Sequence, residues 1–185
     1  MENPSEFSRN ETIAKYNIRT NMNKTIKIKP HHFIDIITSF SAERVILKPH
    51  YYYHNVHSIS KTILENRNTL LEIDLGADDI CEPCIHNING VCDDMLDISN
   101  RPKVPPLKRE WNLMLDTRWC KRLGIDQGTI ISVIEFCSLL EEGSNNLMEI
   151  YKENKKEHTI EREVRLKKGL KKYLTLSVLY NYETE

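Results

Sequence analysis

Residues 108–124 read KREWNLMLDTRWCKRLG, and this stretch decides the fold class. Its apolar side chains recur every three or four positions, which places them on one face of an α-helix. They are Trp111, Met114, Leu115, Trp119 and Leu123. Gly124 follows the last of them and suits the left-handed residue that ends many helices. The pattern predicts a helix over residues 108–123 that packs on a hydrophobic core.

Further helices are predicted on both sides of this stretch, and they cover residues 31–40, 49–66, 136–140, 145–155 and 159–174. Pro30 suits the first turn of a helix, because the N–H that proline lacks would have no partner there. Ser132 and Glu135 have the spacing of a capping box. The alternation of polar and apolar residues in 25–29 and the apolar run in 69–75 predict two short strands.

These elements predict a mostly α fold of the α+β class. It is a single helical domain with two or three short strands and a cysteine-rich metal-binding loop. Residues 1–24 are polar, and we expect them to form a loose N-terminal arm. Residues 25–142 are expected to form the metal-binding core domain. Residues 143–185 are expected to add C-terminal helices that pack on this core and carry a basic tail.

The composition is that of an ordinary globular protein, with 39% hydrophobic and 29% charged residues among 185. The formal net charge of −1 makes nucleic acid an unexpected partner. No apolar run is long enough for a membrane span or a secretory signal. We therefore expect a cytoplasmic protein without a membrane partner, and a homo-oligomer is compatible with this composition. Thiols stay reduced in the cytoplasm, which favours metal binding over disulfides.

Three of the five cysteines lie in one short stretch, residues 78–94, which reads DDICEPCIHNINGVCDD. The spacing of Cys81 and Cys84 lets two thiolates on one tight turn reach one centre. Asn89 and Gly90 form a turn signal that can fold the chain back and bring in Cys92. Such a polar loop has little core of its own, and a bound metal would supply the missing cohesion. We therefore expect Cys81, Cys84 and Cys92 to ligate a metal centre.

The spacing alone leaves the metal and the fourth ligand open. It matches neither a paired zinc ribbon nor the common ferredoxin patterns, so iron–sulfur and zinc remain alternatives. Cys120 is the first candidate for the fourth ligand, because its helix can pack over the loop. Cys137 lies on an apolar helix face and is expected to be a core residue. His86 offers a nitrogen ligand within the loop. If no fourth residue binds, a cluster with three thiolates would leave one iron open to substrate.

Two stretches resemble the motifs of a small uncharacterised family predicted to bind iron–sulfur clusters. Residues 29–35 read KPHHFID and are similar to the family's Arg-x-His-His-Leu-Leu-Cys motif. Residues 78–84 are similar to its Asp-Asp-Ile-Cys-x-Pro-Cys loop, and the resemblance spans about residues 26–125. It implies an iron–sulfur cluster, with the 4Fe–4S type favoured, and it names no reaction. Asp35 stands where the family often has cysteine, which strengthens the case for Cys120.

Four histidines are the predicted catalytic residues: His31, His32, His54 and His57. The first two follow a strand at the start of a helix, and the expected 49–66 helix places the other two on one face, together with His50. Imidazole can move a proton near neutral pH, which a cluster does poorly. The predicted function is an iron–sulfur enzyme that uses such a histidine on a small-molecule substrate. The alternatives are a non-catalytic electron carrier and a structural zinc-binding module.

Overall fold

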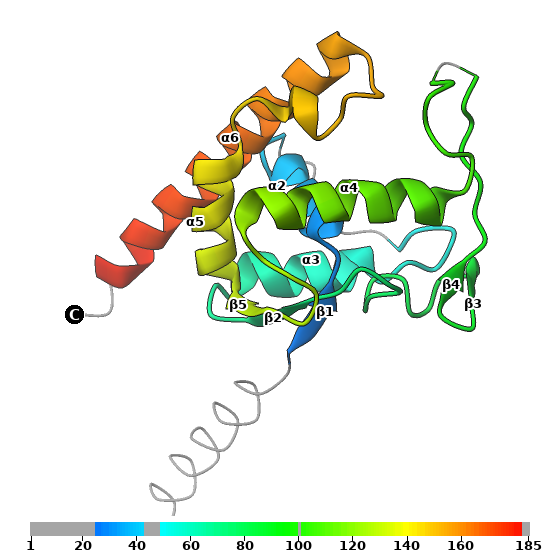
Figure 1. The fold of residues 1–185 in the computed structure, drawn as a ribbon. Helices are drawn as coiled ribbons and strands as arrows, with labels where there is room; N and C mark the ends of the chain where they lie inside the picture. The colour runs from blue at the N-terminus through cyan, green and yellow to red at the C-terminus, as the bar shows by residue number, and fades with distance from the viewer. Residues whose placement is uncertain (1–24, 43–48, 100, 183–185) are drawn as a thin grey trace, which may run out of the picture.

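The computed structural model describes residues 25–42, 49–99 and 101–182, so the predicted N-terminal arm lies outside the described residues. Within them are five α-helices: α2 (Pro30–Phe40), α3 (Val56–Glu65), α4 (Lys108–Leu123), α5 (Val133–Gly143) and α6 (Lys156–Tyr182). Short strands complete two small sheets. The prediction of a mostly helical fold with a few short strands is confirmed (Figure 1). No described helix combines the length with the apolar composition that a bilayer crossing demands.

The larger sheet has three strands in the order β1–β2–β5 and comprises β1 (Ile26–Ile28), β2 (Leu70–Ile73) and β5 (Ile130–Ser132). β1 and β2 are parallel, with Ile26 opposite Leu71, and α2 and α3 lie between them in the chain. β5 pairs with β2 in the antiparallel direction. Ser132 then caps α5 through the predicted capping box with Glu135. The sheet therefore fixes the start of α2, which borders the site described below.

The second sheet is a hairpin of β3 (Asn87–Ile88) and β4 (Val91–Cys92). Asn89 and Gly90 have φ values of 53° and 84°, as a two-residue hairpin turn with both central residues left-handed requires. Asn87 lies opposite Cys92 in the register. The turn signal in the sequence thus folds the chain back and returns Cys92 towards the other two cysteines of the loop.

Two predicted helices are wrong in extent. α3 begins at Val56 rather than at Pro49, because Tyr53 adopts a left-handed φ of 61°. The Tyr53 N–H donates to the His50 carbonyl at 2.8 Å and closes a turn there. His50 and His54 therefore precede the helix, and the predicted helical face shared by three histidines does not form.

The helix predicted over 145–155 is replaced by a single 3-10 turn, Leu147–Glu149. Asn146 has a φ of 54°, which no regular helix accommodates. Arg122 donates to the carbonyls of Asn145 and Asn146, so these backbone groups have partners without a helix. α6 instead starts at Lys156 and extends beyond the predicted end at residue 174.

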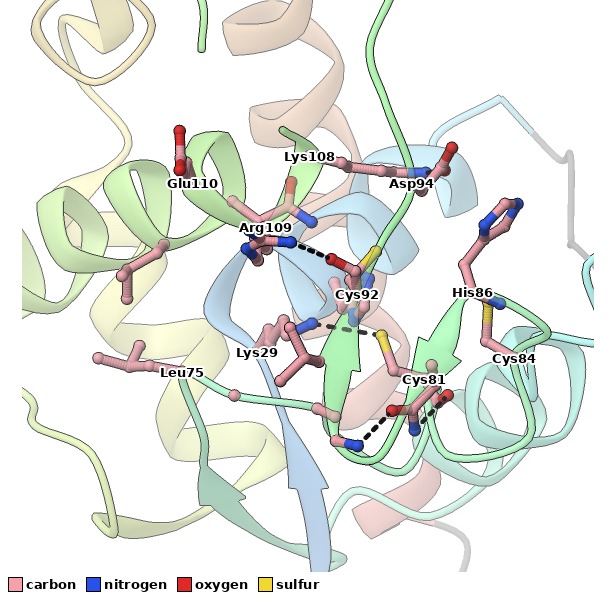
Figure 2. Close-up of a pocket in the computed structure, with 18 of the residues that line it drawn as sticks. Lys29, Leu75, Cys81, Cys84, His86, Cys92, Asp94, Lys108, Arg109 and Glu110 are labelled. Atoms are coloured by element: carbon pink, nitrogen blue, oxygen red, sulfur yellow. Dashed lines mark hydrogen bonds and ion pairs between the residues drawn. The ribbon is translucent and has the colours of Figure 1, made fainter. Parts of the chain in front are cut away.

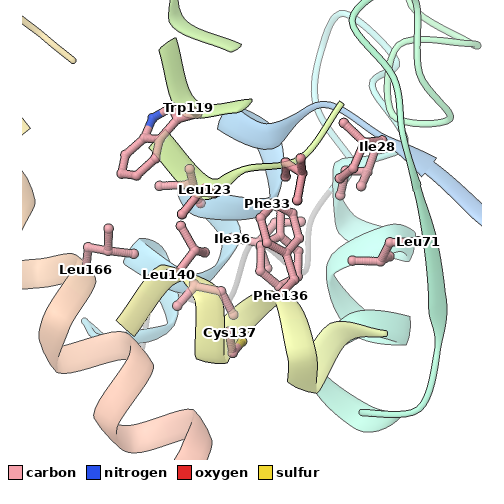
Figure 3. Close-up of a cluster of buried hydrophobic side chains, with 14 of the residues drawn as sticks. Ile28, Phe33, Ile36, Leu71, Trp119, Leu123, Phe136, Cys137, Leu140 and Leu166 are labelled. Carbon is pink, nitrogen blue, oxygen red and sulfur yellow. The ribbon is translucent and has the colours of Figure 1, made fainter. Parts of the chain in front are cut away.

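The hydrophobic core lies among α2, α4, α5 and α6, and Figure 3 shows part of it. Phe33 of α2 stacks on Phe136 of α5 with 4.4 Å between ring centroids. The buried Trp119 donates its indole N–H to the Tyr151 hydroxyl at 3.1 Å. α2 and α6 approach closely at Gly169, where an added Cβ would lie 2.1 Å from the Ile37 carbonyl oxygen. This packing holds the C-terminal helix against the helix that borders the site.

Candidate metal centre

The cysteine loop is organised by backbone hydrogen bonds within residues 78–87. The N–H groups of Cys81 and Glu82 both donate to the Asp78 carbonyl at 2.9 Å. The Cys84 N–H donates to the Cys81 carbonyl at 3.0 Å, which closes the turn between the two cysteines. The Asn87 side chain donates to the Cys81 carbonyl at 3.2 Å and ties the hairpin to this turn. The loop therefore has a defined shape with very little regular secondary structure.

Cys81, Cys84 and Cys92 all line one cavity of about 310 Å³ (Figure 2). Its other walls come from the start of α2, from residue 54, from residues 75–77 and from the first turns of α4. Figure 2 shows Arg109 of α4 reaching the hairpin, where it donates to the Cys92 carbonyl at 3.1 Å, and Lys108 reaching Asp94, to which it donates at 2.8 Å. The fold thus brings the three predicted thiol ligands to the same hollow.

Asp78 is the buried residue that joins this loop to the start of α2. Its carboxylate accepts the backbone N–H of Lys29 at 2.8 Å and that of Cys81 at 3.0 Å. It also accepts the Nδ1–H of His32 at 2.7 Å. Burial opposes its ionisation, but the electrostatic interactions and hydrogen bonds with His32 and Lys29 outweigh burial and lower the pKa of Asp78. The ionised Asp78 carboxylate, which has no exposed side-chain surface, therefore holds the Lys29 backbone, the Cys81 backbone and the His32 ring in place.

Lys29 points its ammonium group at the Cys81 sulfur, with 3.2 Å between Nζ and Sγ (Figure 2). Burial disfavours the charge of Lys29, but Cys81 and Asp78 outweigh it and raise the pKa of Lys29. Burial and the Asp78 carboxylate raise the pKa of Cys81 to about 12, against the opposing effect of Lys29. A metal ion that binds Cys81 would therefore displace a proton from its thiol.

Two of the four predicted catalytic histidines, His32 and His54, line the cavity. His31 and His57 are not among its lining residues. His31 faces α4, where Asp116 accepts its backbone N–H at 2.8 Å and its Nδ1–H at 2.7 Å. His57 lies on α3, and its Nδ1 is buried and has no hydrogen-bond partner among the described residues. His86 of the cysteine loop also lines the cavity, and its Nδ1–H donates to Asp93 at 2.8 Å.

His54 is electrically neutral at physiological pH. Burial, followed by the nearby charges of His50 and Lys108, lowers the pKa of His54 to about 4. Its ring stacks on His50 with 4.7 Å between the ring centroids. A neutral imidazole in a cavity can accept a proton or ligate a metal, because one ring nitrogen carries a free lone pair.

The structure does not bring Cys120 to this cavity. Cys120 and Cys137 are both buried in the hydrophobic core cluster. Burial, with the nearby Asp116 and Asp126 carboxylates, raises the pKa of Cys120 to about 11. Asp35 faces α6 and pairs with Arg162 at 2.5 Å. Neither position 35 nor position 120 supplies a thiol to the site.

Among the described residues, one group of three metal-ligating side chains has its ligand atoms within 4.8 Å of one another: His32, Asp78 and Cys81. Sequence reasoning named two of these residues and missed the role of Asp78. It also missed Asp116, although a fully buried carboxylate on the apolar face of α4 signals a partner. These partners could not be read from spacing, because His32 and Asp78 are 46 positions apart and His31 and Asp116 are 85 apart.

The comparisons with known proteins give no relative from which a role for this site can be transferred. No protein-family model, no curated protein and no solved structure matches the chain, so the interpretation of the site rests on its own geometry.

Proposed function

We propose that the protein binds an iron–sulfur cluster through Cys81, Cys84 and Cys92, and that the cluster serves a small substrate in the adjoining cavity. The observation that carries this proposal is the convergence of all three cysteines of one polar loop on one cavity. Cysteine side chains with no metal role prefer the hydrophobic core, as Cys120 and Cys137 do here. Three thiols around a hollow are the arrangement that a thiolate-ligated cofactor requires.

The cysteine pattern favours a cluster over a structural zinc ion. Zinc ribbons usually pair two Cys-x2-Cys knuckles, whereas this loop has one such knuckle and a single further cysteine. The resemblance of the cysteine loop to a family predicted to bind such clusters supports the same cofactor, with the 4Fe–4S type favoured.

The cavity walls support the second half of the proposal. His54 is unprotonated at neutral pH and lines the cavity together with the cysteines. Such a histidine can accept a proton from a bound molecule, and Arg109 together with the Lys108–Asp94 ion pair adds polar groups to the same cavity. A small molecule held there would lie between the thiolate-bound cofactor and a proton acceptor. An electron carrier without substrate does not need these groups.

A mononuclear zinc site at His32, Asp78 and Cys81 is the second candidate, because these are the ligand atoms that lie close together. Its formation carries a cost, because Asp78 would exchange its partly buried hydrogen bond with His32 for a metal bond. A cluster bound by the three cysteines leaves this hydrogen bond in place.

The proposal is tested by purifying the protein without oxygen and measuring iron, acid-labile sulfide and zinc per chain. We expect a brown protein that contains iron and sulfide. Cys81→Ser, Cys84→Ser and Cys92→Ser should each lose most of both, because the thiolates are the bonds that hold the cluster. Cys137→Ser is the matched control and should retain them, since Cys137 lies in the core. Stoichiometric zinc without iron and sulfide would refute the cluster and favour the second candidate.

A further inference from the structure

We propose that His32 is the fourth protein ligand of this cluster and binds it through Nε2. This inference rests on the cluster proposed above. It commits to a nitrogen ligand where sequence reasoning favoured a thiolate from Cys120. The resulting ligand set is three cysteines and one histidine.

The geometry of His32 is that of a metal-binding histidine. Its Nδ1–H donates to the Asp78 carboxylate at 2.7 Å, which fixes the tautomer and leaves the Nε2 lone pair for a metal. Histidines that ligate metals almost always donate their other ring N–H in this way. Asp78 is itself held by two backbone N–H groups, so the imidazole is oriented by a rigid partner. The His32 side chain keeps 19% of its surface exposed and lines the cavity.

His32 is also close to a proposed thiolate ligand. One of its ring nitrogens lies within 4.8 Å of the Cys81 sulfur. The same carboxylate that orients His32 accepts the backbone N–H of Cys81, so Asp78 sets both side chains at once. Asp78 therefore holds a candidate nitrogen ligand and a candidate thiolate ligand beside each other.

The other candidate ligands are less well placed. Cys120 and Asp35 do not line the cavity. His86 lines it, but its partner Asp93 has 57% of its side chain exposed and lies just after the short hairpin. His54 stacks on His50 and follows the left-handed Tyr53 in a connecting segment. His32 stands on the first turn of a helix whose start is fixed by the sheet, and is therefore the most rigidly presented nitrogen in the cavity.

A histidine ligand has a chemical consequence for the cofactor. Replacing a thiolate by a neutral imidazole removes one negative charge from the site and raises the reduction potential. The Lys29 ammonium, 3.2 Å from the Cys81 sulfur, acts in the same direction. The site is therefore built to make the cluster a weaker reductant than one with four thiolates.

The test is pulsed electron paramagnetic resonance of the reduced cluster in protein that carries ¹⁵N-labelled histidine. We expect a ¹⁵N hyperfine coupling in the wild type. His32→Cys should keep iron and sulfide, lose the coupling and shift the reduction potential to more negative values, because a thiolate replaces the imidazole. A wild-type cluster without the coupling, or a coupling that persists in His32→Cys, would overturn the assignment of His32. A wild type without iron and sulfide would instead refute the cluster itself.

The assignment can also be decided without altering His32, in case His32→Cys does not fold. The histidines that line the cavity are His32, His54 and His86. We expect the ¹⁵N coupling to survive in both His54→Gln and His86→Gln, which leaves His32 as its source. Loss of the coupling in either variant would assign the ligand to that residue and overturn the proposal.

Discussion

Asp78→Asn is expected to lower the free energy of unfolding by about 3–5 kcal/mol, the cost of breaking a buried ionic interaction. The Asp78 carboxylate accepts three hydrogen bonds, from the backbone of Lys29, the backbone of Cys81 and the His32 ring. Asparagine keeps one acceptor oxygen and turns an NH₂ group towards these donors. The NH₂ group faces an N–H donor from which it cannot accept, and the negative charge beside the Lys29 ammonium is removed.

Urea unfolding followed by tryptophan fluorescence measures this loss, because Trp111 and Trp119 are both buried. Asp74→Asn is the control in the same part of the chain. Asp74 accepts the Gly76 N–H at 2.6 Å in an exposed hydrogen bond, so its replacement should cost less than about 1 kcal/mol. If the two substitutions lowered the free energy of unfolding equally, the buried hydrogen bonds of Asp78 would not be the main source of its stabilising effect.

The effect of Asp78 should depend on pH with a defined sign. The pKa of this carboxyl is lowered in the folded protein, so its contribution is fully present above the ordinary carboxyl pKa of about 3.9. The contribution is lost as the pH falls below that value. The difference in stability between the wild type and Asp78→Asn should therefore shrink in acid. A constant difference between pH 7 and pH 3 would show that the carboxyl is not ionised in the folded protein.

Gly169→Ala is expected to destabilise the protein by about 2 kcal/mol or more, although alanine favours an isolated helix by up to about 1 kcal/mol. A Cβ at position 169 would lie 2.1 Å from the Ile37 carbonyl oxygen and 3.0 Å from its carbon. These are backbone atoms of α2, so the two helices must separate. Their separation loosens the packing of the buried Leu166, Leu170 and Tyr173.

Thermal unfolding should show a fall in Tm of about 4–8 °C for Gly169→Ala. Gly143→Ala is the matched control, because the added Cβ there meets the end of the Leu123 side chain at 2.6 Å. A side-chain end can turn away where a backbone carbonyl cannot, so this variant should stay within about 1 kcal/mol of the wild type. A Gly169→Ala protein as stable as the wild type would mean that α2 and α6 do not pack as closely as described.

Sequence signals between neighbouring residues predicted several helix boundaries correctly. The apolar stripe of residues 108–123 and the stop at Gly124 both depend on neighbours within a few positions, and the helix has these bounds. The capping box at Ser132 is equally local. The helix expected from Pro49 failed because Tyr53 is left-handed, a conformation that its sequence neighbours do not encode.

The same difference between local and long-range structure applies to the candidate site. Spacing alone indicated that Cys81, Cys84 and Cys92 act together, since a tight turn and a hairpin are local structures. The contact of Lys29 with Cys81 spans 52 positions and follows from the pairing of β1 with β2. No periodicity or motif reports such a contact, because it depends on how the strands pair in three dimensions. The tertiary structure was therefore needed to find Lys29 and Asp78.

The cavity is assembled from separated parts of the chain. During synthesis, these parts therefore emerge from the ribosome one after another. The cysteines at 81, 84 and 92 leave the ribosome before the wall formed by residues 108–113 of α4. A nascent chain therefore exposes three thiols before the α4 wall of their cavity has formed. A chain truncated before this helix would therefore carry the thiols in a form more open to oxidation.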